Sequence, residues 1–292
     1  MEITHVLRGE DLLSSTPRQI VLYRALEELG IAKFMPRFGH LPYVMGEGNK
    51  KLSKRDPESN LLLHREAGMI PEGLNNYLAL LGWSISPDND VFSMEEMAAA
   101  FDISDVNPNP ARFDPKKCIA INAEHIRLLE PDDFRGRIVP FLHRDGLVSA
   151  DSFDELTADE QKIMQHASPL IQTRIQLLGE APGMLGFLFT EDDALELDEK
   201  SVSKLKENAP EVLDATIHFI ENYDGPFTTE ALEHALRELI VEGMDIKPRI
   251  AFGPIRVAVT GRQVSPPLFE SMEILGRESV LNRLHSLRNR LG

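Results

Sequence analysis

The chain opens with the stretch Ile3-Thr4-His5-Val6-Leu7-Arg8-Gly9-Glu10-Asp11, and this stretch decides how the rest of the sequence is interpreted. Side chains alternate between two faces up to Arg8, which is the period of a β-strand, and Gly9 begins a polar turn. Ligands of parallel sheets bind beyond the carboxyl ends of the strands. Arg8 is therefore a candidate to grip a carboxylate, and Asp11 to accept hydrogen bonds from a ribose or an amine. An Arg–carboxylate pair that only stabilises the turn fits the same residues equally well.

A helix follows this strand, and a second strand-like run follows the helix. Thr16 with Gln19 has the pattern of a capping box, Pro17 suits the first helical position, and Gly30 ends the helix. The run 41–45, Leu-Pro-Tyr-Val-Met, reads as a short strand. These elements predict part of an α/β nucleotide-binding fold at the N-terminus.

From about residue 60 the pattern changes to helices joined by short loops. We expect them at 71–82, 94–101, from 115 onward, and at 131–144, 151–166, 168–179, 199–221, 229–243, 247–260 and 266–290, with a break near Gly276. The fold class is therefore mainly α. We divide the chain into 1–58, 59–130 and an all-helical 131–292, the last with a further division near 195.

Composition narrows the class of protein. The 292 residues carry a net charge of −16, but residues 1–60 hold nine basic and eight acidic side chains, and residues 245–292 hold eight and four. The acidity lies in the middle, so a local basic face can still bind nucleic acid. No apolar run is long enough to span a membrane, and a single cysteine argues against a cysteine-ligated zinc site. We expect a cytoplasmic protein without a metal site.

The stretch Lys50-Lys51-Leu52-Ser53-Lys54-Arg55 concentrates positive charge after a glycine-containing turn. Such a loop could fold over a triphosphate and neutralise the charge that grows on a leaving pyrophosphate. An exposed basic turn without function explains the same residues, and the stretch by itself does not choose between the two.

Taken in order, several motifs resemble one family. Arg8-Gly-Glu-Asp11, then Ser15-Thr-Pro-Arg-Gln19, then Pro36-Arg-Phe-Gly-His-Leu-Pro42, then the Lys-Leu-Ser-Lys-Arg stretch resemble the later part of the catalytic domain of bacterial glutamyl-tRNA synthetase, a class I enzyme. The stretch 71–83 resembles the helices of that family that contact the tRNA stem. Residues 254–261 and 265–268 resemble its anticodon-binding end. The resemblance thus covers nearly the whole chain.

One departure from the family is large: its His-x-Gly-His signature, which stabilises the ATP phosphates, does not occur in these 292 residues. We therefore expect a C-terminal portion of the enzyme that lacks the first part of the catalytic domain. On that expectation the fragment is inactive in catalysis by itself and holds no cofactor, but it retains affinity for tRNA.

For the catalytic part the resemblance implies that Arg8 binds the carboxylate of glutamate. Asp11 would face the ATP–glutamate site, and the backbone near Val44 would meet the adenine. Lys51 and Lys54 would stabilise the phosphates. The loop residues implied in catalysis are Lys51, Ser53 and Lys54.

For the helical part the resemblance implies an anticodon site. Arg174, which we expect inside a helix, would sense the third anticodon base, and Arg256, Ser265 and Leu268 would contact anticodon bases. A guanidinium can bond the open edge of an unstacked base, and Leu268 could pack on a base face. A solvated Arg174 paired with Glu180 is the alternative.

The full-length enzyme would use ATP and Mg²⁺ to activate glutamate and would pass it to tRNA(Glu), acting as a monomer without contact to membranes. Two alternatives remain at this point: a non-catalytic helical module that binds a protein through its acidic middle, and a relative of glutaminyl-tRNA synthetase. The anticodon-binding part of the latter enzyme is a β-barrel, which the expected helices after residue 130 argue against.

Overall fold

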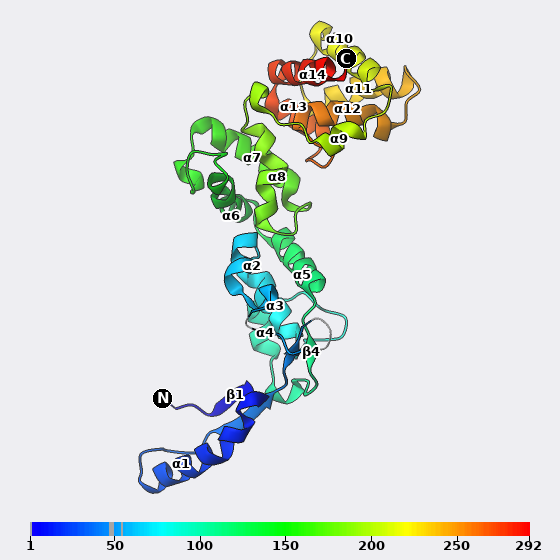
Figure 1. Cartoon of the computed structure of the whole chain (residues 1–292). Coiled ribbons are helices and arrows are strands. Elements are labelled where there is room, and N and C mark those ends of the chain that lie inside the picture. The colour runs from blue at the N-terminus through cyan, green and yellow to red at the C-terminus, as the bar shows by residue number, and fades with distance from the viewer. Residues whose placement is uncertain (1, 47–49, 54) are drawn as a thin grey trace. The chain divides into compact units, whose positions relative to one another are not determined.

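The computed structural model describes residues 2–46, 50–53 and 55–292, and it divides into two compact units, residues 1–125 and 126–292 (Figure 1). We call them the N-terminal unit and the helical unit. The fold is mainly helical, as predicted. Among the described residues, no helix combines the length and the apolar character that crossing a membrane requires.

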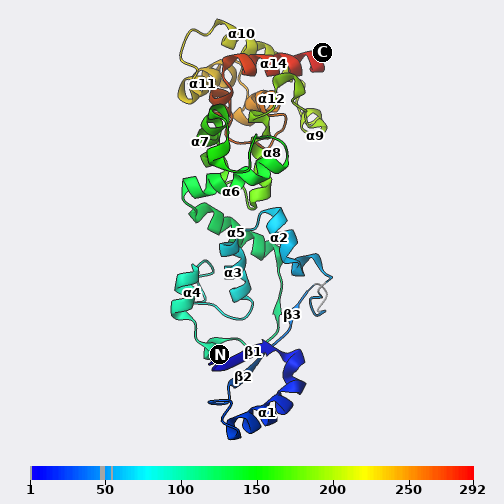
Figure 2. The same cartoon turned by 90° about the vertical axis from the view of Figure 1, so that its left-hand side faces the viewer.

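The N-terminal unit begins with a small parallel β-α-β arrangement. Its elements are β1 (His5–Gly9), a 3₁₀ turn (Glu10–Ser15), α1 (Thr16–Glu28), β2 (Arg37–Leu41), β3 (Val44–Met45), α2 (Leu61–Ala67), α3 (Pro71–Leu80), α4 (Met94–Ala100), β4 (Ala111–Arg112) and most of α5 (Pro115–Leu128). β1 pairs in parallel with β2, Val6 opposite Phe38, and β3 pairs in parallel with β4 (Figure 2). Tyr23 of α1 meets Phe38 edge-on, so α1 covers the face of the sheet that carries Val6 and Phe38.

The second strand differs from its prediction. The expected strand 41–45 is interrupted at Pro42, and β2 lies before the proline while β3 lies after it. Proline has no N–H to donate to a β-ladder, which explains the interruption. The predicted capping box at Thr16 is also wrong: Thr16 is already inside the helix, and its hydroxyl accepts a hydrogen bond from Arg8 instead.

The rest of the N-terminal unit has a small core of its own. Trp83 meets Phe92 and Phe101 edge-on, and Tyr77 meets Phe113 in the same way. The helices α3 and α5 approach closely at Gly73, where a Cβ atom would lie 2.7 Å from the backbone of the facing helix. Ser93 caps α4 through a complete capping box, as the sequence predicts.

The helical unit contains only helices and turns among residues 126–292, all of which are described. Its elements are α6 (Pro131–Arg144), α7 (Ala158–Gln172), α8 (Ala181–Leu185), α9 (Glu199–Ser203), α10 (Ala209–Asn222), α11 (Thr229–Leu236) continued by a π-helical turn (Arg237–Glu242), α12 (Pro248–Thr260), α13 (Leu268–Leu275) and α14 (Arg277–Leu291). The helices α10, α12, α13 and α14 enclose a continuous apolar core. The break predicted at Gly276 separates α13 from α14, and this glycine has φ +82°.

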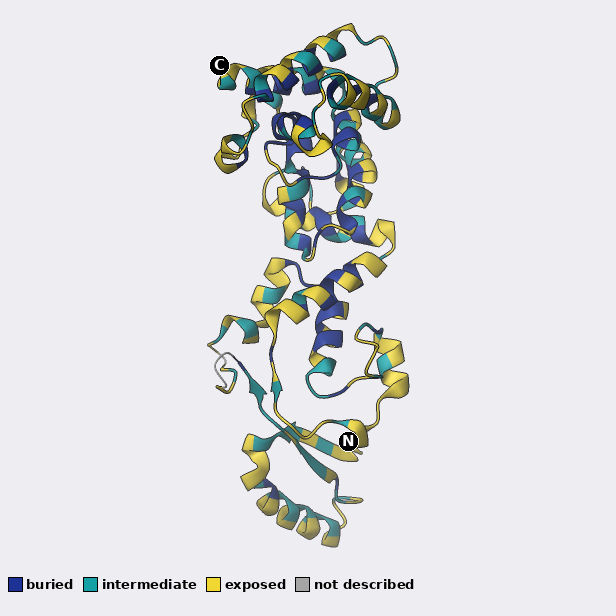
Figure 3. Cartoon of the chain, turned by 90° about the vertical axis from the view of Figure 1, so that its right-hand side faces the viewer, coloured by how far each residue is buried: buried dark blue, intermediate teal, exposed yellow. Residues whose placement is uncertain are grey.

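A buried arginine joins separate segments of the helical unit. Arg283 of α14 is 3% exposed and donates hydrogen bonds to Asp192 and to the backbone carbonyls of Phe187, Thr190 and Val259. It thereby joins the turns before α9 to α12 and α14. Figure 3 shows how many buried residues these helices contain and how few lie on β1, α1 and β2.

Candidate functional site

The side chain of Arg8 has defined contacts at the end of β1. Its Nη2 donates to Thr16 Oγ1 at 2.6 Å, its Nε donates to His40 Nε2 at 3.4 Å, and its guanidinium lies 5.6 Å from the centre of the Phe38 ring. The residue is half-buried. The strand, the start of α1 and β2 thus fix the arginine at the sheet edge where a ligand would bind.

The structure brings together Lys51 and Asp11, two of the residues that the resemblance implies in the catalytic part. Lys51 Nζ lies 3.8 Å from Asp11 Oδ2 and 3.8 Å from the centre of the Tyr43 ring. The carboxylate and the ring face both attract the ammonium group, although each attraction is modest because both charged side chains are about half exposed. Lys54 lies outside the described residues.

The remaining loop residues form a hydrogen-bonded turn. Ser53 N donates to Asp56 Oδ2 at 2.6 Å, and Ser53 Oγ accepts from Arg55 N at 3.2 Å. The Val44 carbonyl accepts from Leu52 N at 2.9 Å, which attaches the loop to β3. That carbonyl is therefore occupied from within the loop, and the adenine contact predicted near Val44 stays a prediction.

This loop borders a cavity of about 690 Å³ in the N-terminal unit. Its cationic lining comes from Lys50, Lys51 and Arg112, with Asp56, Glu58 and Asp114 at other points. Ammonium groups beside a cavity of this size suit the phosphates of a nucleotide. Among the described residues no cluster of His, Cys, Asp and Glu could hold a metal ion by itself. Mg²⁺ commonly binds through one or two carboxylates and the substrate phosphates, so such a cluster is not required.

The predicted anticodon residues lie in the helical unit, and two of them are joined directly. Arg256 of α12 donates to Ser265 Oγ at 2.6 Å and to the Pro266 carbonyl at 2.7 Å. Burial and the nearby charge of Arg174 lower the pKa of the Arg256 guanidinium, while Glu270 acts in the opposite direction. Arg174, Arg256 and Glu270 therefore share one electrostatic neighbourhood.

The structure corrects two details of this set. Arg174 is not inside a helix: α7 ends at Gln172, and Arg174 lies exposed in the turn that follows. Glu180 accepts instead from the backbone N–H of Gln176, and no ion pair joins it to Arg174 within the described part of the chain. Leu268 and Ser265 are only 3% and 4% exposed, so neither offers an open side chain to a base, whereas Arg174 does.

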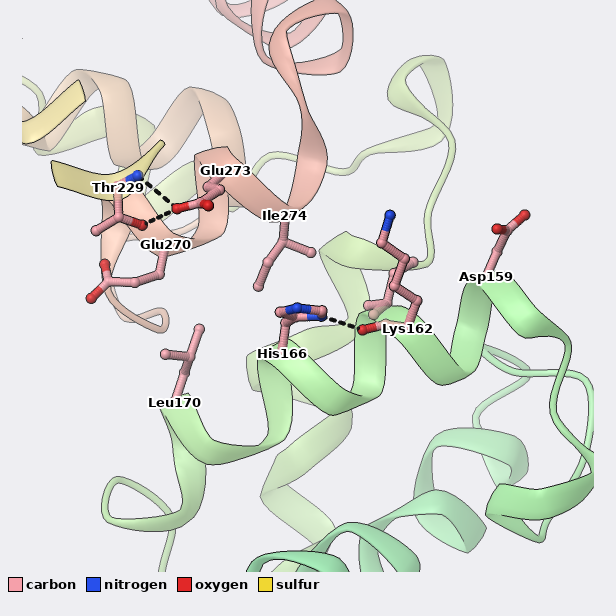
Figure 4. A pocket seen from close by; sticks show the side chains of 9 residues that line it. Asp159, Lys162, His166, Leu170, Thr229, Glu270, Glu273 and Ile274 are labelled. Atoms are coloured by element: carbon pink, nitrogen blue, oxygen red, sulfur yellow. Dashed lines mark hydrogen bonds between the residues drawn. The ribbon is translucent and has the colours of Figure 1, made fainter. Parts of the chain in front are cut away.

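Sequence reasoning missed a groove beside these residues. It lies between α7 and α13, has a volume of about 560 Å³, and is lined by Asp159, Lys162, Ile163, His166, Leu170, Thr229, Glu270, Glu273 and Ile274 (Figure 4). The α7 residues recur at helical spacing with mixed polar and apolar character, which is the only local signal of this surface. The packing of α7 against α13 creates the groove, and this packing joins segments about 100 residues apart.

Comparison with known proteins gives two family matches. Residues 133–288 match the family described as anticodon binding domain, and residues 1–119 match the catalytic domain of class I tRNA synthetases (E and Q). The first match covers more than half of the chain. It encloses Arg174, Arg256, Ser265, Leu268 and the groove between α7 and α13.

Individual relatives agree with these families. The chain is 62% identical to the glutamate–tRNA ligase of Kocuria rhizophila and 61% identical to that of Bifidobacterium adolescentis, over its whole length. The crystal structure of a glutamate tRNA ligase from Elizabethkingia meningosepticum in complex with its amino acid superposes with a TM-score of 0.78 at 25% identity and covers all of this chain. The chain spans 56%, 58% and 58% of the lengths of these three proteins. It therefore belongs to the glutamate–tRNA ligase family, with a class I catalytic region followed by an anticodon-binding domain.

Proposed function

We propose that this chain is the tRNA-contacting part of a glutamate–tRNA ligase and that residues 126–292 bind the anticodon loop of tRNA(Glu). One observation carries the proposal: the anticodon-binding match over 133–288 encloses an exposed arginine, Arg174, beside a second arginine, Arg256, held by hydrogen bonds. Single-stranded loops expose base edges and phosphates that guanidinium groups bind. The surrounding acidity limits contact with RNA elsewhere on the surface.

The two arginines have different tasks in this proposal. Arg256 supports the turn at 265–266 that precedes α13, because its Nη1 atom donates to both residues of this turn. Arg174 has no hydrogen-bonded partner among the described residues and is free to bond a base. Ser265 and Leu268 shape the surface beneath, because both are buried.

For the complete enzyme we propose activation of glutamate and its transfer to tRNA(Glu), in the cytoplasm and by a monomer. ATP with Mg²⁺ supplies the adenylyl group when bound. Arg8 orients the glutamate carboxylate, and Asp11 holds Lys51 beside the cavity of about 690 Å³, where its ammonium group offsets negative charge. Lys54 would act with Lys51. We expect no glutamate-dependent pyrophosphate exchange from these 292 residues alone, because the residues present provide only part of the phosphate-binding groups.

The test is the affinity of the 292-residue chain for tRNA(Glu), measured by filter binding and compared with an unrelated tRNA. Arg174→Ala should weaken binding about tenfold, as expected for loss of one arginine contact to a base. Arg290→Ala, which removes an exposed arginine of α14, should change it less than twofold. Equal affinity for both RNAs, or equal effects of the two substitutions, would overturn the proposal. A helical module that binds a protein partner would be indifferent to Arg174.

A further inference from the structure

His40 lies directly opposite Arg8 in the small parallel sheet. The pairing of β1 with β2 matches their Cα atoms, one residue before the end of each strand. Side chains two residues apart along a strand share a face, so Arg8 and His40 lie on the face of Val6 and Phe38, which α1 covers. The start of α1 brings the hydroxyl of Thr16 to the same point.

Three side chains close a triangle of hydrogen bonds there. Arg8 Nη2 lies 2.6 Å from Thr16 Oγ1, Thr16 Oγ1 lies 2.9 Å from His40 Nε2, and Arg8 Nε lies 3.4 Å from His40 Nε2. Thr16 is 7% exposed, and the other two residues are half-buried. Because water reaches this point poorly, a misdirected proton costs more than it would at an open surface.

The donors and acceptors of the triangle assign its protons. A guanidinium can only donate, so Thr16 Oγ1 accepts from Nη2 of Arg8, and His40 Nε2 accepts from Nε. The Thr16 hydroxyl directs its own proton to His40 Nε2, because the Leu12 carbonyl, its alternative acceptor, lies 3.5 Å away. His40 therefore carries its proton on Nδ1 and offers a bare Nε2. A proton on Nε2 would oppose the Nε–H group of Arg8.

The triangle uses one edge of the Arg8 guanidinium and leaves another open. Nε and one N–H of Nη2 are bonded, whereas Nη1 has no hydrogen-bonded partner among the described residues. Nη1 and the second N–H of Nη2 form the end of the guanidinium fork, which can hold a carboxylate through two parallel hydrogen bonds. His40 thus determines which edge of Arg8 faces a ligand.

Fixing this side chain in advance also favours binding. Arginine is among the side chains that lose most rotamer freedom when they become ordered. An arginine that is already held by His40, Thr16 and the ring of Phe38 loses less of that freedom when the ligand arrives. The contacts are polar and local, so they can act on a segment whose packing is sparse.

We propose that His40 is a positioning residue for Arg8. Its bare Nε2 occupies Nε of the guanidinium, so that Arg8 presents the Nη1–Nη2 edge to the carboxylate of glutamate. The inference rests on the proposed function, because it takes Arg8 to hold this carboxylate. It also specifies what Arg8 requires of its neighbour: an acceptor at the place of Nε2, rather than an imidazole ring as such.

The first measurement is the nuclear magnetic resonance spectrum of the 292-residue chain, labelled with ¹⁵N at arginine and histidine. The Nε–H signal that Arg8→Lys removes belongs to Arg8, and the ring signals that His40→Gln removes belong to His40. We expect His40 to carry its proton on Nδ1, and the Nε–H signal of Arg8 to persist at neutral pH through slow exchange with water. A proton on Nε2 of His40 would overturn the proposal.

Two amide substitutions separate the place of the acceptor from the presence of the ring. Glutamine and asparagine both offer an amide oxygen, but only the longer glutamine side chain can bring it to the place of Nε2. His40→Gln should therefore keep the Nε–H signal of Arg8, while His40→Asn and His40→Leu should lose it. The same result in all three variants, signal kept or signal lost, would overturn the proposal. Unchanged signals of the other arginines show that the variants are folded.

The second measurement uses the complete enzyme and the glutamate dependence of its pyrophosphate exchange. His40→Asn and His40→Leu should raise the KM for glutamate about tenfold while kcat changes less than about threefold, because a carboxylate contact that persists through the reaction contributes uniform binding. His40→Gln should keep the KM within about threefold of the unsubstituted value. His5→Asn, at an exposed histidine where β1 begins, is the matched control and should change neither constant.

Two failures are distinguishable. If Arg8→Ala leaves the KM for glutamate unchanged, the proposed role of Arg8 in the complete enzyme fails. If Arg8→Ala raises this KM, but the three substitutions of His40 all leave it unchanged or all raise it equally, only the positioning role of His40 is overturned.

Discussion

The β1–α1–β2 segment and the helical unit differ in how they are held together. The helices α10, α12, α13 and α14 surround a core of fully buried aliphatic side chains. In residues 5–41, all of which are described, only Thr16 and Pro36 are buried, and Val21 and Leu22 of α1 are 66% and 57% exposed. The candidate catalytic residues are therefore supported by polar contacts on a weakly packed segment, whereas the candidate RNA-binding residues lie on a packed scaffold.

The difference has a physical reason. Parallel strands are normally covered on both faces, and two strands alone give little stability. Here α1 covers one face, while Leu7 and Leu41 on the other face border a groove of about 390 Å³ that Trp83 also lines. Precise positioning of Arg8 and Lys51 consequently depends on contacts such as Thr16 and Asp11, which water can replace.

The largest expected effect on the free energy of unfolding comes from replacing the buried arginine of the helical unit, and it would sharpen this contrast. Arg283→Ala would leave three backbone carbonyls without their donor and Asp192 without its charged partner, although Ser279 and Asn282 still donate to Asp192, and we expect a loss of about 3–5 kcal/mol in the free energy of unfolding. Urea unfolding followed by circular dichroism measures it. Arg288→Ala, which breaks an exposed pair with Asp214, should lower the urea midpoint far less than Arg283→Ala does. Similar losses for the two would refute the assigned role of Arg283.

A matched pair of leucines compares the two regions directly. Leu213→Ala in the core should destabilise the helical unit by about 2–5 kcal/mol, because it removes buried surface and leaves a cavity. Leu22→Ala on α1 should change stability by less than about 0.5 kcal/mol, because the side chain is already mostly in water. A large effect at Leu22 would mean that α1 is packed more tightly than its exposure indicates.

The helical unit should also lose stability in acid. Burial opposes ionisation of Asp192, but hydrogen bonds from Ser279, Arg283 and Asn282 outweigh it and lower the pKa of this carboxyl. A lowered folded-state pKa contributes stability that is complete above the unfolded value near 3.9 and is lost as pH falls through the folded value. The urea midpoint should therefore fall below about pH 4. Asp192→Asn should be less stable at pH 7 and show a shallower fall, and an unchanged slope would contradict this assignment.

The smallest effect is expected at the loop of the N-terminal unit. Asp11→Asn removes the exposed partner of Lys51 and should change stability by less than about 0.5 kcal/mol. A larger thermal shift in differential scanning fluorimetry would show that this pair, rather than packing, holds the segment. Glu2→Gln, which alters another exposed pair, with Lys33, is the control.

The local parts of the fold could be predicted from the sequence, because their signals are local. Ser93 with Glu96, Pro131 and Gly276 each mark a helix boundary that the structure contains. The prediction of separate helices around Ser168 was wrong, because α7 continues through Pro169. Buried residues on both sides of the proline favour continuation over its local preference.

The parts of the candidate site that depend on packing were harder to predict from the sequence. The motif order that resembles a family implies that Lys51 and Asp11 belong to one site, but it does not predict that they pair. The hydrogen bond from Arg8 to Thr16 likewise requires the strand to meet the start of α1. The buried state of Leu268 and the groove at His166 arise from helix packing across about 100 residues, which no local pattern encodes.

The most direct measurement is amide hydrogen exchange of the 292-residue chain, alone and with tRNA(Glu), read at the level of peptides. We predict slower exchange in the segments 159–176 and 262–274 when tRNA(Glu) is present, and no such change with an unrelated tRNA at the same concentration. Protection that leaves the segments 159–176 and 262–274 unchanged, or equal protection by both RNAs, would contradict the assignment of anticodon reading to the helical unit.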